Sequence, residues 1–379
     1  MNKKKILFLT ATRADYGKMK PLMLAIEESK DFECNIFVTG MHTLKEFGST
    51  KTEIFKDRFR NIHVYMNQII EEPMDLVLAN TINGFSRYLR ELNPDMIVVH
   101  GDRVEALAGA ISGAMNNILV AHIEGGEVSG TIDESIRHAI SKLSHIHFVS
   151  NDDAKKRLLQ LGENESSIYV IGSPDIDIIM DIPTLTIEEV KDRYDITFDE
   201  YSVLIYHPVT TEINDLRYNI KQLVDATFLS DDNFIIINPN NDSGYNIILE
   251  EFRRFDNYSK VKKFPSMRFE YFIELLRNAK YMIGNSSSGI HEAPVIGLPC
   301  VNIGTRQENR FSHETIINCS DDTNQILAAI DNAKRIKKIK PSTYFGNGKS
   351  RDKFITIISK PDIWETPKQK SFWNISFGG

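Results

Sequence analysis

The amino-acid sequence predicts an α/β protein with two doubly wound, parallel-sheet domains. Its 379 residues exceed what one hydrophobic core usually supports. The content of 41% hydrophobic and 26% charged residues is that of an ordinary globular protein. Short β-rich runs alternate with helical patterns in both halves of the chain, and this alternation predicts βαβ units.

In the first half, the helical segment 16–29 places Met19, Leu22, Met23 and Ile26 on one face, so it is expected to cover one side of a sheet. The strands of that sheet are expected at residues 6–9, 34–38, 96–99, 118–122, 146–149 and 168–171. These runs and the helices between them define a first Rossmann-like domain.

The second half repeats the pattern after a polar stretch. We expect a first domain over residues 1–174, a linker over 175–199 and a second domain over 200–361. Strands of the second domain are expected at 203–206, 234–237, 261–264, 281–283 and 300–303. The tail, 362–379, contains Trp364 and Trp373, and such aromatic residues are expected to dock on the protein.

Charge and composition exclude several classes of partner. The net charge is −7 and the basic residues are scattered, which argues against binding along a nucleic-acid backbone. No stretch approaches the roughly 18 apolar residues of a membrane helix. Arg13 and Asp15 interrupt the first apolar run before it could serve as a signal peptide. Three sparse cysteines, Cys34, Cys300 and Cys319, favour a cytoplasmic protein.

Polar residues that follow the predicted strands are the candidate site residues, because ligands of parallel sheets bind at the carboxyl ends of the strands. Arg13 stands at a helix start, where it could meet a phosphate beside free backbone N–H groups. The alternative is a capped turn with a surface arginine. Asp102, in the motif His-Gly-Asp-Arg, faces a ligand or caps the next helix.

Two further carboxylates are candidate site residues, one at a strand end and one at a helix start. Glu124 precedes paired glycines that would let the backbone approach a ligand closely, although a flexible turn is equally consistent with them. Asp133 lies in a predicted first helical turn together with Glu134, where acidic residues also favour the helix dipole. Spacing alone leaves both interpretations open for each residue.

The second half contains a serine-rich turn between a strand and a helix. Ser286, Ser287 and Ser288, with their backbone amides, could cradle a diphosphate. Glu292, about one turn further on, could accept hydrogen bonds from ribose hydroxyls. The motif His-Pro-Val-Thr-Thr begins at His207.

No metal and no cofactor are expected. His100 and His122 are the obvious metal candidates, but neither has a convincing set of partners, and His145 and His147 fit structural roles better. The chain lacks Gly-x-Gly-x-x-Gly after its first strand, and it contains no P-loop and no serine nucleophile elbow.

Taken together and in order, these motifs resemble the UDP-N-acetylglucosamine 2-epimerases. The matching pieces are Thr-Arg-Ala-Asp-Tyr-Gly, His-Gly-Asp-Arg, His-Ile-Glu-Gly-Gly-Glu, Ser-Ile-Arg-His, His-Pro-Val-Thr-Thr and Gly-Asn-Ser-Ser-Ser-Gly-Ile. The resemblance covers roughly residues 4–331 and is greatest to the hydrolysing branch, which supplies sialic acid precursors. It implies a GT-B-like fold with the active site in the interdomain cleft and with the tail packed back on the first domain.

The resemblance also implies roles for individual residues. Asp102, Glu124 and Asp133 match the family's catalytic carboxylates, and Phe269 is expected near the uracil. Residues expected around the UDP-sugar are Arg13, Arg137, His207, Ser286, Ser287, Ser288, Gly289 and Glu292. The family further implies a homodimer or homotetramer, and the helix at 74–92 is a candidate contact face.

The expected reaction is loss of UDP from C1 of UDP-N-acetylglucosamine together with the C2 proton, since that proton is not acidic enough to leave alone. Water then adds to the resulting 2-acetamidoglucal and gives N-acetylmannosamine. Burial and mutual repulsion could keep one of the three carboxylates protonated as the acid.

The resemblance favours hydrolysis over reversible epimerisation, because the chain departs from the family's non-hydrolysing branch at two places. His207 is followed by Pro-Val-Thr instead of that branch's arginine-rich run, and the loop between Glu124 and Asp133 is shorter. The principal alternative is the same reaction on UDP-2,4-diacetamido-2,4,6-trideoxyglucose, for legionaminic acid. More remote alternatives are a GT-B glycosyltransferase and a non-catalytic UDP-sugar sensor.

Overall fold

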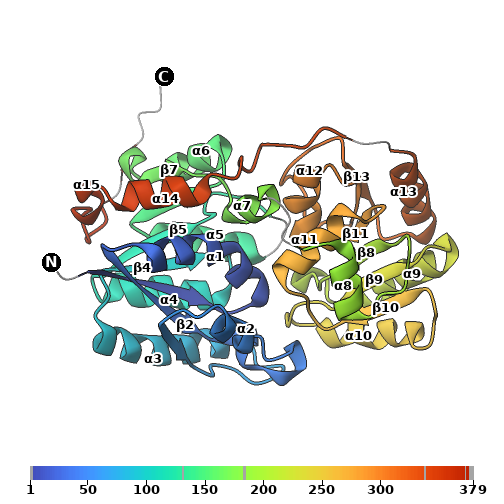
Figure 1. Ribbon diagram of the computed structural model, residues 1–379, viewed down its shortest axis with the longest axis horizontal. Coiled ribbons are helices and arrows are strands. Elements are labelled where there is room, and N and C mark those ends of the chain that lie inside the picture. Colours follow the sequence, from blue (N-terminus) through green and yellow to red (C-terminus); the bar gives the residue numbers. More distant parts are fainter. Residues whose placement is uncertain (1–2, 130–131, 182–184, 337–338, 372, 375–379) are drawn as a thin grey trace. The chain divides into compact units, whose positions relative to one another are not determined.

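The computed structural model describes residues 3–129, 132–181, 185–336, 339–371 and 373–374. The chain divides into two compact units, each with its own parallel sheet (Figure 1). The first unit comprises residues 1–127, 133–180 and 344–379, and the second comprises residues 128–132 and 181–343. Two parallel-sheet α/β domains therefore confirm the predicted fold class.

The first unit contains a seven-stranded sheet in the order β3-β2-β1-β4-β5-β6-β7. All its neighbouring strands pair in parallel. The strands are β1 (Lys4–Thr10), β2 (Phe32–Val38), β3 (Asn61–Val64), β4 (Met96–His100), β5 (Leu119–Ile123), β6 (Ile146–Val149) and β7 (Ile168–Val170). The helices are α1 (Arg13–Glu28), α2 (Lys51–Lys56), α3 (Met74–Leu92), α4 (Val104–Met115), α5 (Ile132–Leu143), α6 (Asp152–Gln160), α7 (Pro174–Met180), α14 (Ser350–Ile358) and α15 (Pro361–Trp364).

Side chains alternate along β1 between two cores, one on each face of the sheet. Ile6 and Phe8 join the core that contains the apolar stripe of α1, namely Met19, Leu22, Met23 and Ile26. Leu7 and Leu9 join the core on the opposite face, with residues of α3 and α4. Burial on both faces explains why the central strands are continuous apolar runs. The predicted stripe of α1 is confirmed.

The second unit contains a six-stranded parallel sheet in the order β10-β9-β8-β11-β12-β13. Its strands are β8 (Ser202–Ile205), β9 (Phe234–Ile237), β10 (Val261–Phe264), β11 (Met282–Gly284), β12 (Cys300–Ile303) and β13 (Ile316–Cys319). Its helices are α8 (Ile187–Tyr194), α9 (Leu216–Ser230), α10 (Tyr245–Phe252), α11 (Phe269–Arg277), α12 (Glu292–Ile296) and α13 (Thr323–Arg335).

The units divide the chain differently from the expected domains. Residues 344–361, expected in the second domain, belong to the first unit, because α14 buries Phe354 and Ile358 in the core shared with α1. The expected linker, 175–199, contains most of α7 in the first unit and all of α8 in the second. The sequence did not reveal these helices, because α8 buries only Val190 and the buried residues of α7 include the carboxylates Asp175 and Asp177.

The tail packs on the first unit at two places. Trp364 contacts the ring of Phe32 with a centroid distance of 5.9 Å and donates its indole N–H to the carbonyl of Ile358. The ammonium group of Lys370 reaches the carbonyls of the last turn of α5. Trp373, in contrast, is half exposed, so the expectation that both tryptophans dock is wrong for this one.

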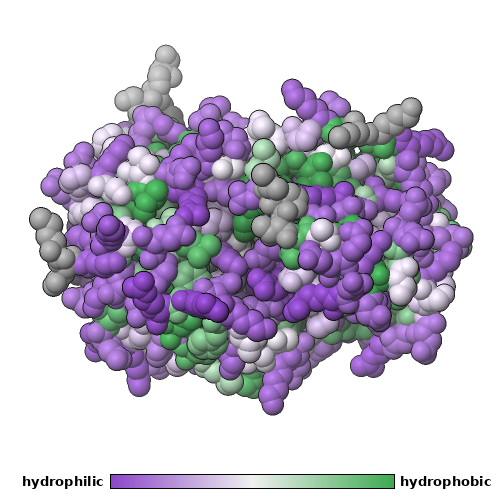
Figure 2. Space-filling view, viewed as in Figure 1, coloured by the Kyte–Doolittle hydropathy of each residue, from purple (hydrophilic) through white to green (hydrophobic). Residues whose placement is uncertain are grey.

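Hydrophilic residues predominate on the face drawn in Figure 2, with hydrophobic residues scattered between them. Within the described residues, no helix combines the length and apolar character needed to cross a membrane.

Candidate active site

The carboxyl ends of β1, β4 and β5 lie side by side, because these strands are neighbours in one parallel sheet. Three predicted site residues follow these strands within about one to three positions: Arg13 after β1, Asp102 after β4 and Glu124 after β5. The topology thus brings together residues that are more than a hundred positions apart in the chain, at the edge where parallel sheets bind ligands.

Glu124 is buried directly after β5, in a left-handed backbone conformation with φ of 62°. Its amide N–H donates to the carbonyl of Phe148 at 2.9 Å, which fixes this backbone. The carboxylate accepts a hydrogen bond from His100 Nε2 at 3.0 Å and another from the hydroxyl of Ser173. A left-handed residue other than glycine costs about 1–2 kcal/mol, and such strain clusters at functional sites.

The charges around Glu124 oppose the effect of its burial. Burial alone would raise the pKa of this carboxyl, but Lys18 and His100 outweigh it and hold the pKa well below its usual range. For His100, burial lowers the pKa and Glu124 more than offsets this, so the pKa is raised. Glu124 is therefore ionised at neutral pH, and it is not the carboxyl that burial keeps protonated.

Asp102 follows a turn at Gly101, whose φ is 70°. The N-cap of α4 is Arg103, so the alternative that Asp102 caps this helix is wrong. Asp102 instead forms an ion pair with the buried guanidinium of Arg137, which also donates to the carbonyl of Glu127 at 3.1 Å. A charged, bidentate-capable donor thus fixes the position of the carboxylate.

Asp133 lies in the first turn of α5 and is partly buried. It precedes Arg137 by four residues, so the two side chains share one face of the helix. Since Arg137 reaches Asp102, this face of α5 is directed toward the end of β4. Of the three predicted carboxylates, Asp102 and Glu124 thus follow neighbouring strands, and Asp133 extends from the helix that contacts one of them.

The buried histidines of this region have structural roles. His122 donates from Nε2 to the carbonyl of Gly101 at 2.8 Å and accepts from the hydroxyl of Ser141 at 3.0 Å. Burial lowers its pKa to about 3, so the ring is neutral. His145 accepts from the backbone of Val120 and donates to that of Lys368, and this confirms its structural interpretation.

The glycines after Glu124 are required by the protein's own packing. A Cβ at Gly125 would lie 2.7 Å from Nδ1 of His122, and one at Gly126 would lie 2.3 Å from the carbonyl oxygen of Ala154. The backbone at these glycines does make a close approach, but it approaches His122 and Ala154 of the protein itself rather than a ligand.

Arg13 begins α1, where the helix start is already capped. Thr12 and Asp15 form a capping box, and the Asp15 carboxylate accepts the amide groups of Ala11 and Thr12. The expectation of free amides is therefore wrong for these positions. Arg13 pairs with Glu53 at 2.5 Å.

In the second unit, Asn285 joins the ends of β8 and β11. Its side-chain oxygen accepts the amide of His207 at 2.7 Å, and its amide nitrogen donates to the carbonyl of His207 at 2.9 Å. The Nδ1 atom of His207 accepts from the amide of Asn240, so the neutral ring has its proton on Nε2. The carbonyl of Asn285 accepts from Arg306 and Gln307.

The serine turn directly follows Asn285, and Ser287–Gly289 forms a short 3-10 helix, η6. Amide groups of Ser288, Gly289, Ile290 and His291 donate to oxygens of Ser286 and Ser287. A Cβ at Gly289 would lie 2.3 Å from Sγ of Cys300, so the turn is packed closely on β12. Because these amides already have acceptors, serine hydroxyls rather than amides are the donors that this turn offers to an anion.

The two remaining predicted residues also lie in the second unit. Glu292 begins α12 and is buried. Phe269 begins α11 and is buried against Phe272. All the predicted residues of the second unit therefore follow strand ends or begin helices.

Sequence reasoning missed three residues of the site in the first unit. Ser173 hydrogen-bonds Glu124, Lys18 lowers its pKa, and the buried Asp175 pairs with Lys18 at 3.0 Å. Ser173 follows β7, so the strand-end rule could have identified it. Lys18 lies in the second turn of a helix, where nothing in the sequence distinguishes it from a surface lysine.

Two parallel α/β units, with polar residues at the carboxyl ends of their strands, place the protein in the GT-B-like fold class. A model of the UDP-N-acetylglucosamine 2-epimerase family matches residues 24–359. The chain therefore belongs to this family.

Individual relatives agree with this assignment. The chain is 45% identical over 376 residues to the UDP-N-acetylglucosamine 2-epimerase of Neisseria meningitidis serogroup B, covering 98% of this chain and 100% of that protein. It is 36% identical to the hydrolysing UDP-N,N'-diacetylbacillosamine 2-epimerase of Legionella pneumophila, covering 94% and 95%. In fold it resembles the Methanocaldococcus jannaschii UDP-GlcNAc 2-epimerase solved with UDP-GlcNAc and UDP, with a TM-score of 0.81, 22% identity and coverage of 94% and 99%.

Proposed function

We propose that this protein hydrolyses UDP-N-acetylglucosamine to N-acetylmannosamine and UDP, with inversion at C2, for sialic acid or surface polysaccharide synthesis. The observation that carries the proposal is the environment of Glu124. A buried carboxylate that remains ionised, held by His100 and Ser173 on a strained backbone, has the properties of a positioned base. Membership in the family supplies the substrate class.

In the proposed first step, Glu124 takes the proton from C2 while the bond between C1 and the diphosphate oxygen breaks. The electrons of the C2–H bond form the C1–C2 double bond, and UDP leaves with the electrons of the C1–O bond. His100 stays hydrogen-bonded to Glu124 and stabilises its charge before the transfer. The product of this step is 2-acetamidoglucal.

In the second step, water adds its hydroxyl to C1 and C2 receives a proton on the opposite face. Asp102 and Asp133 are the proposed carboxyl groups for handling these protons. Arg137 holds Asp102 in place through their ion pair. Free N-acetylmannosamine results because oxygen from water, instead of UDP, returns to C1.

The diphosphate is proposed to leave without a metal ion, stabilised by Arg13, His207 and the hydroxyls of Ser286, Ser287 and Ser288. Arg137, Gly289, Glu292 and Phe269 complete the proposed binding set, with Phe269 at the uracil. Activity that persists in the presence of a chelator supports this arrangement, and a requirement for Mg²⁺ contradicts it.

Incubation with UDP-N-acetylglucosamine in D₂O, followed by proton NMR, tests the function. Free N-acetylmannosamine with deuterium at C2, together with UDP, is the expected product. UDP-N-acetylmannosamine as the end product would instead indicate reversible epimerisation. Transfer to an added acceptor sugar would indicate a glycosyltransferase, and an unchanged substrate with tight binding would indicate a sensor.

The second candidate substrate is UDP-2,4-diacetamido-2,4,6-trideoxyglucose, for legionaminic acid. The 36% identity to the Legionella pneumophila relative favours it, whereas the 45% identity to the Neisseria meningitidis relative favours UDP-N-acetylglucosamine. Comparing kcat/KM for the two substrates decides between them, because discrimination at sugar C4 and C6 is expressed in that ratio.

A further inference from the structure

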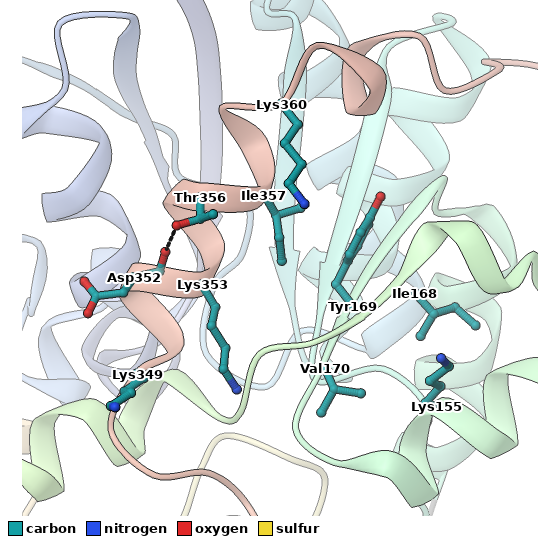
Figure 3. Close-up of a pocket in the computed structure, with 10 residues that line it drawn as sticks. All are labelled: Lys155, Ile168, Tyr169, Val170, Lys349, Asp352, Lys353, Thr356, Ile357 and Lys360. Atoms are coloured by element: carbon teal, nitrogen blue, oxygen red, sulfur yellow. Dashed lines mark hydrogen bonds between the residues drawn. The ribbon is translucent and has the colours of Figure 1, made fainter.

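A surface cavity of about 580 Å³ lies beside the edge strand β7, in the first unit (Figure 3). Its volume is within the range of small-molecule sites. The lining comes from α6, β7, and α14 with the residues flanking it: Lys155, Ile168, Tyr169, Val170, Lys349, Asp352, Lys353, Thr356, Ile357 and Lys360. None of these residues belongs to the proposed UDP-sugar site.

Lysine side chains dominate the charge of this cavity. Lys155 comes from α6, and its ammonium pairs with Glu165 at 2.8 Å. Lys349, Lys353 and Lys360 form no ion pair among the residues that the structure describes. Figure 3 shows the amino groups of Lys353 and Lys360 on the side of α14 that faces β7.

Acidic groups of the lining do not neutralise Lys349, Lys353 and Lys360. Asp352 is the one acidic residue in the lining, and its carboxylate points away from β7 in Figure 3. Burial raises the pKa of the Tyr169 phenol, and the charge of Asp362, which lies beyond the cavity, raises it further. The cavity therefore has an excess of positive charge.

The floor of the cavity is apolar and contains an open strand edge. Ile168 and Val170 of β7 pack toward α6, while Tyr169 of β7 and Ile357 of α14 pack against the core on the other face of the sheet. β7 is the last strand of its sheet, so every second backbone N–H faces outward without a neighbouring strand. Cationic groups, backbone donors and an aromatic ring thus surround one space.

We propose that this cavity is a second binding site, for a small molecule that has both a phosphate monoester and an apolar or aromatic group. Lysine ammonium groups bind phosphate as point charges, and the ring of Tyr169 with Ile357 offers a surface to the organic part. At three residues, β7 is too short to hold an added peptide strand. A phosphorylated metabolite is consequently the occupant that this geometry favours.

Isothermal titration calorimetry of the protein with phenyl phosphate tests the proposal. Saturable binding to the wild-type protein is expected, also when UDP is present in excess. The double variant Lys353→Ser/Lys360→Ser should bind about tenfold more weakly or worse. The control Lys30→Ser/Lys45→Ser removes the same charge from exposed positions of the first unit outside the cavity, and it should bind like wild type.

Three results would overturn the proposal. The first is equal affinity of the two double variants, with thermal midpoints that show both to be folded. The second is competition by UDP, which would place the bound phenyl phosphate in the nucleotide site. The third is binding of inorganic phosphate or phosphatidylserine vesicles as tight as that of phenyl phosphate, because either would assign the lysines to a general anionic surface.

Discussion

At the scale of single residues, neighbouring charges decide the ionisation of the candidate site. Glu124 and His100 are both buried, and burial alone would make each of them neutral. The hydrogen bond and opposite charges of the two groups reverse this for both, and Lys18 adds to the reversal for Glu124 alone. Burial therefore does not keep the Glu124 carboxyl protonated, and a role as base is the better hypothesis for this residue.

Substitution of Glu124 by Gln should lower kcat by about 10²- to 10⁴-fold, which is the usual contribution of a positioned base. The amide keeps the shape of the side chain but cannot take a proton. UDP binding should remain, since the hydrogen-bond partners of Glu124, His100 and Ser173, lie outside the serine turn. Initial rates of UDP release and calorimetry with UDP measure the two effects.

Glu134→Gln is the matched control. Glu134 lies on α5 beside Asp133 and pairs with His138 on the helix surface. Its kcat should change less than about twofold, because burial lowers the pKa of His138, and the contact that is lost at neutral pH is one with an uncharged ring. A similar loss of kcat in both variants would argue against a specific role for Glu124.

The neutral His122 gives the protein a sensitivity to acid. Its pKa is about 6.5 in the unfolded chain and about 3 in the folded protein. The unfolded state therefore binds the extra proton below pH 6.5, and stability is full above that value and decreases as the pH falls. Between pH 7.5 and 5.5 this histidine costs roughly 1.4 kcal/mol of unfolding free energy.

His122→Gln should remove that part of the pH dependence, because glutamine can still donate to the carbonyl of Gly101 but does not titrate. Urea unfolding at the two pH values measures the change. An unaltered pH dependence in the variant would contradict the prediction, because it would show that folding does not shift the pKa of His122.

At the scale of elements, the sequence predicts best what is buried on both faces. The central strands of both sheets lie close to their expected positions, since two-sided burial requires an unbroken apolar run. β3 and β13 were missed because they are edge strands that carry polar, partly buried or exposed residues such as Asn61 and Asn318, whereas the edge strands β7 and β10 were predicted. An edge strand needs apolar residues on fewer positions, so its pattern is diluted.

The candidate site shows the same limit. The strand-end rule identified Asp102 and Glu124, because position along a strand is a local property. The pairs Asp102–Arg137 and Glu124–His100 join residues on different elements. Such pairs depend on strand order, which no local pattern specifies.

The contact between the tail and α5 is a further prediction at this scale. The Lys370 ammonium donates to the carbonyls of Ser141, Lys142 and Ser144, and it pairs with Glu163. Cations at helix C-termini satisfy the last carbonyls and the helix dipole. Lys370→Ala should therefore lower the unfolding free energy by about 2 kcal/mol, measured by urea denaturation.

Lys368→Ala provides the comparison for this experiment. The side chain of Lys368 is exposed, and its backbone carbonyl accepts a hydrogen bond from His145, which the substitution leaves in place. Its removal should have almost no effect on stability. Equal destabilisation by both substitutions would mean that the charge of the tail, rather than the cap, is what stabilises α5.

At the scale of the whole molecule, the last segment of the chain completes the first unit. Phe354 of α14 is fully buried, with its ring 5.0 Å from that of Phe148. Phe354→Ala should destabilise the first unit by about 3–5 kcal/mol. Hydrogen exchange should then show faster amide exchange in β1, β5 and β6 and unchanged exchange in β8, β9 and β11.

Phe252→Ala is the converse variant, because this side chain is buried in the core of the second unit. Its effect on amide exchange should be confined to that unit. If either variant accelerated exchange equally in both sheets, the two units would unfold together as one cooperative body.

The return of residues 344–379 to the first unit has a consequence for the order in which a ribosome releases the chain. Apart from residues 128–132, the second unit is one continuous stretch, 181–343, and it is synthesised before the segment that closes the first. At a synthesis rate of about 5–20 residues per second, the apolar surface that α14 covers stays exposed for roughly ten to thirty seconds before α14 is made. The half of the protein that emerges first is therefore the half that finishes folding last, and during that interval it is the part most dependent on chaperones.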